Sequence, residues 1–161
     1  MLMILRAGVM ITILSFNPSL WAYSPPPTMF EEEVNKTFCQ SKLNEVLLFF
    51  KKYPKFDFNK MYNGMRPIWQ VINCDQNDSE KVFKLLVKNG VIPGEMELLS
   101  ALRMRSLRFT ALVLEFGTFT TWNAIGADLV EEAKETRHKA IYEMVFSAKN
   151  ASQRQPKQSE K

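Results

Sequence analysis

Histidine and cysteine are scarce in this sequence, and their scarcity limits the chemistry that it can support. The 161 residues include one histidine, His138, and two cysteines, Cys39 and Cys74. A structural zinc site is built mainly from Cys and His ligands, so we expect no metal site. Two cysteines without CxxC spacing are also too few for a disulfide scaffold. A single bridge between them is compatible with the sequence, which leaves the question open.

Glycine-rich and catalytic motifs are missing as well. The six glycines form neither GxGxxG nor GxxxxGK[ST], so we expect no nucleotide or other cofactor. A GxSxG elbow and an HExxH pair are also absent. Glu131 and Glu135 share a helix face with compensating lysines nearby, which is typical of a solvated surface. We interpret His138 as a polar turn residue, and we expect that the chain is not an enzyme.

Neither positive nor negative charge clearly predominates, and no single segment carries most of the charged residues. The chain carries 21 Lys and Arg against 17 Asp and Glu, which gives a net charge of +4. Acidic and basic residues alternate, whereas a nucleic-acid binder usually gathers its basic residues on one face. With 46% hydrophobic and 24% charged residues the composition is that of a globular domain. We therefore expect one folded domain that does not bind nucleic acid.

The N-terminus has the order of regions found in a signal peptide. Arg6 precedes an apolar run over residues 7–16, then Asn17 and Pro18 break the run, and Ala22 offers a small residue before a cleavage point. The apolar run is about half the ~20 residues that span a bilayer. We expect a signal peptide over residues 1–22, export to the periplasm or outside the cell, and no stable membrane insertion after cleavage. An uncleaved membrane anchor and a simple apolar N-terminal helix are the alternatives.

The remaining chain divides into a spacer, a domain and a tail. Residues 23–28 contain three consecutive prolines, which favour an extended, stiff spacer. Thr28 can cap a helix whose first turns contain three glutamates, so the domain is expected to begin at residue 29. It is expected to end at residue 147, because residues 148–161 are polar and are predicted to be a flexible tail.

Within the domain the apolar residues follow the helical period. Leu43, Val46, Leu47 and Phe50 lie at i, i+3, i+4 and i+7, and Pro54 ends that helix. Further helices are expected to begin at Pro67, at Ser79, after Gly94, at Leu107 and after Gly126. No segment alternates with period two for long. The predicted fold class is therefore all-α.

The spacing of the helices indicates repeats. Ile68 and Leu98 occupy equivalent places 30 residues apart, and Val130 follows Leu98 after another 32. A period in this range is typical of stacked helix–turn–helix units, so the sequence predicts a short solenoid. In this arrangement we expect Leu85, Leu86 and Leu114 to be buried between the layers. A different helical-hairpin repeat and a single helix bundle are the alternatives.

Particular residues resemble the ankyrin-repeat family. Residues 63–69, with Val82, Leu85 and Leu86 and the pair Asn89-Gly90, are similar to one ankyrin repeat, and residues 126–145 are similar to a terminal capping repeat. Arg66-Pro67-Ile68-Trp69 stands where the family has Thr-Pro-Leu-His. The resemblance covers about residues 35–147, which is about four repeats with their caps.

The resemblance implies a protein-binding module that contacts its partner through the concave face of the stack. Carried over by position, the residues expected to bind the partner are Arg66, Trp69, Gln70, Asn73 and Arg103. The partner is expected to be another protein, and the chain itself a monomer. A secreted, host-directed effector is the alternative function, and an enzyme is a more distant one.

Overall fold

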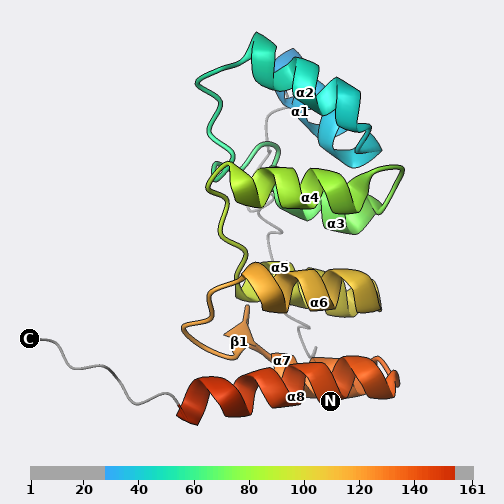
Figure 1. Ribbon diagram of the computed structural model, residues 1–161, viewed down its shortest axis with the longest axis vertical. Coiled ribbons are helices and arrows are strands. Elements are labelled where there is room, and N and C mark those ends of the chain that lie inside the picture. The colour runs from blue at the N-terminus through green and yellow to red at the C-terminus, as the bar shows by residue number, and fades with distance from the viewer. Residues whose placement is uncertain (1–27, 155–161) are drawn as a thin grey trace, which may run out of the picture.

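The computed structural model describes residues 28–154, and this part of the chain is mostly helical (Figure 1). Its helices are α1 Met29–Gln40, α2 Leu43–Lys52, α3 Pro67–Cys74, α4 Ser79–Lys88, α5 Glu95–Arg103, α6 Leu107–Phe116, α7 Leu129–Glu135 and α8 Lys139–Arg154. A two-stranded antiparallel hairpin, β1 Asn123–Ala124 and β2 Ala127–Asp128, precedes α7. The predicted all-α class is confirmed. The predicted signal peptide and most of the predicted spacer lie outside the described residues.

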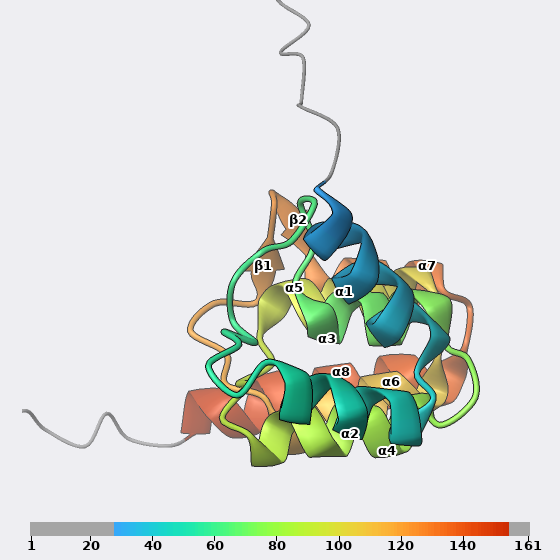
Figure 2. The ribbon, with the colours of Figure 1, turned by 90° about the horizontal axis from the view of Figure 1, so that it is seen from above.

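The helices are arranged as four successive pairs that stack along the long axis of the molecule (Figure 1). Helices α1, α3, α5 and α7 pack on one another in one layer, and α2, α4, α6 and α8 form the other layer (Figure 2). Short turns join the members of each pair; the first has only Ser41 and Lys42 between α1 and α2. A turn this short returns the second helix beside the first.

The helix starts follow from local signals. The Thr28 hydroxyl accepts a hydrogen bond from the Glu31 N–H at 3.2 Å, and the Glu31 carboxylate accepts one from the Thr28 N–H at 2.9 Å. This reciprocal capping box begins α1 at the predicted residue. Pro67 occupies the first turn of α3, where no N–H is needed. None of the described helices is both long enough and apolar enough to cross a membrane.

The core lies between the two layers and extends through all four pairs. Its largest fully buried apolar side chains are Phe38, Phe83, Phe109, Ile68, Ile72, Leu86, Leu98, Leu102, Leu129 and Ile141. The predicted burial of Leu86 is confirmed, but Leu85 and Leu114 are only partly buried. Leu85 directly precedes the buried Leu86 and Leu114 directly follows the buried Val113, so each is rotated by about 100° from a buried neighbour around its helix.

The C-terminal helix is longer than predicted. Helix α8 continues to Arg154, beyond the predicted domain end at residue 147. Its last turns contact the segment before α7: Lys149 Nζ lies 3.5 Å from Asp128 Oδ2, and Trp122 Nε1 donates to Ser152 Oγ at 3.1 Å. These tertiary contacts stabilise a polar stretch that composition alone would assign to a tail.

A disulfide bond joins the first two helix pairs. Cys39, near the end of α1, is bonded to Cys74, the last residue of α3, and their Cα atoms are 5.2 Å apart. The sequence left this pairing open, because the distance between two helix ends depends on how the pairs stack. The bond links residues 35 positions apart and fixes α1 beside α3.

Candidate functional site

Two tight hairpins precede helices of the layer that contains α3 and α7. In the first, Tyr62 and Met65 exchange two backbone hydrogen bonds around Asn63 and Gly64. In the second, Ile125 and Gly126 form the two-residue connection between β1 and β2. All four turn residues have positive φ, between 49° and 78°, as the type I′ hairpin turn requires.

A groove of about 550 Å³ lies beside these hairpins and the first turns of α3 and α5. We call it the loop groove. The side chains that line it include four apolar or aromatic residues and one ion pair: Met61, Trp69, Ile92 and Ile125, and Arg66 with Glu97. They come from the segment before α3, from α3 and α5 themselves, and from the connections that precede α5 and α7. The loop groove is thus assembled from three successive helix pairs.

Apolar side chains at the loop groove are exposed to an unusual degree. Ile125 at the tip of the β1–β2 hairpin is 79% exposed, Ile92 is 61% exposed and Met61 is 55% exposed. Trp69 is half-buried and packs against the core with one side. Apolar side chains that gather around a groove, rather than lying singly, are typical of a surface that contacts another molecule.

An ion pair fixes one wall of the loop groove. Arg66 Nη1 donates to Glu97 Oε1 at 2.7 Å, and Arg66 Nη2 donates to Asn59 Oδ1 at 3.0 Å. The second carboxylate oxygen of Glu97 accepts the Gly94 N–H at 2.8 Å. Glu97 is 1% exposed and Arg66 18% exposed. The guanidinium of Arg66 therefore joins the segment before α3 to the start of α5.

Glu95 fixes the segment that follows α6. Its Oε1 accepts hydrogen bonds from the Thr120 N–H at 2.8 Å and from the Thr121 N–H at 2.9 Å. Partial burial raises the pKa of Glu95, but these backbone hydrogen bonds outweigh it, so the pKa lies below its ordinary value. The carboxylates of Glu95 and Glu97 both accept hydrogen bonds from within the chain.

The structure separates the residues predicted to bind a partner. Arg66 and Trp69 both line the loop groove. Gln70 is 3% exposed, and its amide donates to Asn35 Oδ1, because this side of α3 packs against α1. Gln70 is therefore buried in the contact between α3 and α1.

The other two predicted residues lie elsewhere on the layer. Asn73 is half-buried near the end of α3, with its amide 3.9 Å from Met65 Sδ. Arg103 is exposed at the last turn of α5, where it lies 3.3 Å from Glu132 of α7 and lines a different hollow of about 150 Å³. The five predicted residues therefore do not all line one hollow.

The sequence pattern alone does not mark Met61, Ile92 or Ile125 as contact residues. Each lies in a connection between helices, where exposed apolar side chains are not expected from the turn signals alone. The sequence does contain one local signal of an unusual residue: Ile125 stands directly before the turn glycine Gly126, where a polar residue such as Asn is usual. Among residues 28–154 no group of three or more His, Cys, Asp or Glu residues is placed to hold a metal ion.

Comparison of the chain with protein-family models, with curated protein sequences and with solved structures gives no match.

Proposed function

We propose that this protein is an exported protein-binding module of the ankyrin-like type, and that its partner binds at the loop groove. The observation that carries the proposal is the set of exposed apolar side chains Met61, Ile92 and Ile125 around a groove with Trp69 in its wall. Apolar and aromatic anchors in a preformed groove supply most of the energy of a typical protein interface.

The arrangement of the chain supports the ankyrin-like assignment. Four helix pairs stack in two layers, and hairpins with Asn63-Gly64 and Ile125-Gly126 turns precede α3 and α7. In a stack of this kind each pair contacts only its neighbours, and the connections between pairs can line one extended binding surface. The loop groove lies along such connections.

Ile125 gives independent support for a contact role at the hairpin tip. A β-branched residue at a φ of 49° is strained, and the 79% exposed side chain gains little from packing within the chain. The equivalent position in the first hairpin is Asn63, a residue that tolerates this conformation. Strain without a folding benefit is expected where a side chain is retained for binding.

Of the five residues that the sequence predicted to bind a partner, we assign Trp69 as a residue that contacts the partner. Arg66 is assigned a positioning role because its guanidinium is bonded to Glu97 and Asn59. Gln70 is assigned to the packing of α3 on α1. Asn73 and Arg103 lie outside the loop groove, so their replacement is expected to change partner binding less than replacement of Trp69.

The disulfide supports export. Disulfides persist in the periplasm and outside the cell and are rare in the reducing cytosol. The Cys39–Cys74 bond is therefore in keeping with the signal peptide that the sequence predicts over residues 1–22. N-terminal sequencing of the mature protein should find a start near Tyr23; an intact Met1 on cytosolic protein would reject export.

Site-specific photo-crosslinking in the native cells tests the binding proposal. A photoreactive phenylalanine analogue at Ile92 or Ile125 should give one discrete adduct, with the same partner protein at both positions. The matched control is Leu48 of α2, which is 62% exposed and lies outside the loop groove. Absence of adducts at Ile92 and Ile125 in folded protein, or equal yields at Leu48, would reject the loop groove as the binding surface.

A further inference from the structure

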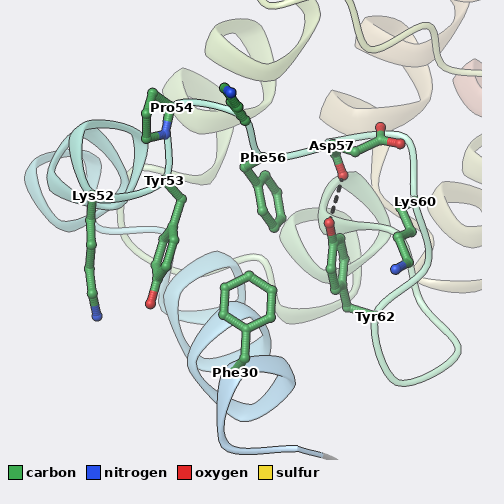
Figure 3. Close-up of a pocket in the computed structure, with 9 residues that line it drawn as sticks. Phe30, Lys52, Tyr53, Pro54, Phe56, Asp57, Lys60 and Tyr62 are labelled. Atoms are coloured by element: carbon green, nitrogen blue, oxygen red, sulfur yellow. Dashed lines mark hydrogen bonds between the residues drawn. The ribbon is translucent and has the colours of Figure 1, made fainter.

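A second cavity, of about 480 Å³, lies between the start of α1, the end of α2 and the connection to α3 (Figure 3). We call it the aromatic pocket. Four rings, those of Phe30, Tyr53, Phe56 and Tyr62, gather around it. Its volume is in the range of about 300–1,000 Å³ that is usual for small-molecule sites. The function proposed above makes no use of this pocket.

The rings are held in place by contacts with one another. Phe30 and Tyr53 meet edge to face with centroids 5.0 Å apart, and Phe56 stacks on Tyr62 at 4.8 Å. Phe30 is 36% exposed although it belongs to this cluster. Because these packed rings restrict one another, the shape of the pocket is largely set before any ligand binds.

The hydroxyl groups of the two tyrosines are already bonded within the chain. Tyr53 Oη donates to Glu33 Oε2 at 2.7 Å. Tyr62 Oη donates to the Asp57 carbonyl oxygen at 3.1 Å, as the dashed line in Figure 3 shows. The carboxylate of Asp57 accepts the Asn59 N–H at 2.9 Å. Both tyrosine hydroxyls thus already form hydrogen bonds within the chain, so a ligand would contact mainly the ring surfaces.

Three lysines supply the charge of the pocket. Lys52, Lys55 and Lys60 line it together with a single acid, Asp57. Lys52 is neutralised by Glu33 at 2.7 Å. Lys55 and Lys60 have no carboxylate within 4 Å in the part of the chain that the structure describes. Neither ammonium group therefore forms a direct ion pair. The Thr28 N–H is the main cause that lowers the pKa of Glu31, and the charge of Lys60 adds a smaller effect, so Lys55 is the less compensated of the two.

The positions that a cationic ligand would take are occupied by the chain's own lysines. Lys52 Nζ lies 4.9 Å from the centre of the Tyr53 ring, and Lys60 Nζ lies 5.8 Å from the centre of the Tyr62 ring. A ligand cation binds best over such ring faces, and here it would meet a like charge. The charge complementarity of the pocket favours an anion.

We propose that the aromatic pocket is a binding site for a small planar organic anion, such as a fused-ring aromatic carboxylate. The flat apolar body lies against the rings of Phe30 and Phe56, and the positive charge of Lys55 and Lys60 at the rim attracts the carboxylate. The lysines act as point charges at a partly exposed rim, so they set the preference for an anion while the rings supply the contact area.

Isothermal titration of the purified protein tests this proposal. The probe is naphthoate, and naphthalene methanol is its neutral analogue of the same shape. The pocket variant is Lys55→Glu with Lys60→Glu, and the matched control is Lys134→Glu with Lys139→Glu, two exposed lysines on α7 and α8 that change the net charge equally. All four positions are exposed, so both variants are expected to keep the circular-dichroism spectrum of the parent.

The proposal expects saturable binding of naphthoate that is weakened about tenfold in the pocket variant, because two charge interactions of the size of exposed ion pairs are reversed. The control variant and the affinity for naphthalene methanol should change by less than about twofold, since neither alters a charge contact at the rim. No binding of naphthoate, or equal weakening in both double variants, would overturn the proposal. These outcomes do not depend on a protein partner at the loop groove.

Discussion

Arg66 Nη1 lies 2.7 Å from Glu97 Oε1, across 31 residues of sequence, and this ion pair connects the second helix pair to the third. The same carboxylate accepts the N–H of Gly94 at the start of α5. Glu97 is 1% exposed, so its charge has little access to water. A buried carboxylate depends on its partners, because removal of one leaves an uncompensated charge.

Replacement of Arg66 by methionine should therefore destabilise the fold. We expect a loss of about 3 kcal/mol in the free energy of unfolding, measured by urea denaturation, because Glu97 would remain buried without its cation. The matched control is Lys84→Met, which removes the exposed pair with Glu80 and should change stability little. A similar loss in both variants would show that the Arg66–Glu97 pair behaves as a surface pair.

Replacement of Ile125 should change folding and binding in opposite directions. Ile125→Asn relieves a β-branched residue at positive φ and should raise the free energy of unfolding by about 1 kcal/mol. Partner binding at the loop groove should fall, because the exposed apolar side chain is lost. The reciprocal change, Asn63→Ile in the other hairpin, should lower stability by a similar amount. An unstabilised Ile125→Asn variant would show that the turn tolerates isoleucine without strain.

Loss of the disulfide should weaken the whole stack. The double variant Cys39→Ser and Cys74→Ser frees a loop that spans 35 positions, and chain entropy predicts a cost of about 3–4 kcal/mol. Urea denaturation with and without dithiothreitol measures the effect. The wild-type protein should shift on reduction to the midpoint of the double variant, and the variant itself should not respond. A midpoint that is unaffected by reduction would mean that the bond contributes nothing to stability.

Asp128 should make the stability depend on pH in the acid range. Its carboxylate accepts the Val130 N–H at 2.8 Å and the Glu131 N–H at 3.2 Å, and the first of these is the main cause that lowers its pKa. A lowered pKa contributes stability that is complete above the ordinary value and is lost as pH falls through the folded value.

The test compares wild-type protein with Asp128→Asn. The asparagine side chain at the N-cap of α7 can still accept a hydrogen bond, but it does not titrate. At neutral pH the wild-type protein should be the more stable of the two, because the charged carboxylate also interacts with Lys149 and with the start of α7. This difference in unfolding free energy should shrink below about pH 4. A constant difference down to about pH 2 would show that Asp128 does not titrate with folding.

Local sequence signals predicted the helices well, because their causes act within a few residues. Thr28 and Glu31 cap α1 through contacts three residues apart, and Pro67 begins α3 because its ring fixes φ. The buried face of α4 follows the helical period, which placed Leu86 correctly. The same period could not separate Leu85 from Leu86, since a helical face has no sharp boundary.

The loop groove could not be predicted from local sequence signals. Of the five residues carried over by position, only Arg66 and Trp69 reach the loop groove, whereas the packing of α3 on α1 buries Gln70. The three exposed apolar residues of the groove come from connections whose sequences carry no periodic signal. Their juxtaposition depends on how three helix pairs stack, which no local pattern encodes.

The sequence by itself therefore determined where the described helices begin, their all-α class and the scarcity of metal-ligating residues. Only the tertiary structure decided that Cys39 meets Cys74, that Arg66 meets Glu97 and that the polar end of α8 is helical. The physical reason is the distance along the sequence over which each kind of interaction acts. Caps, prolines and the helical period act over three or four residues, whereas these contacts join residues about 30 positions apart through the stacking of complete helix pairs.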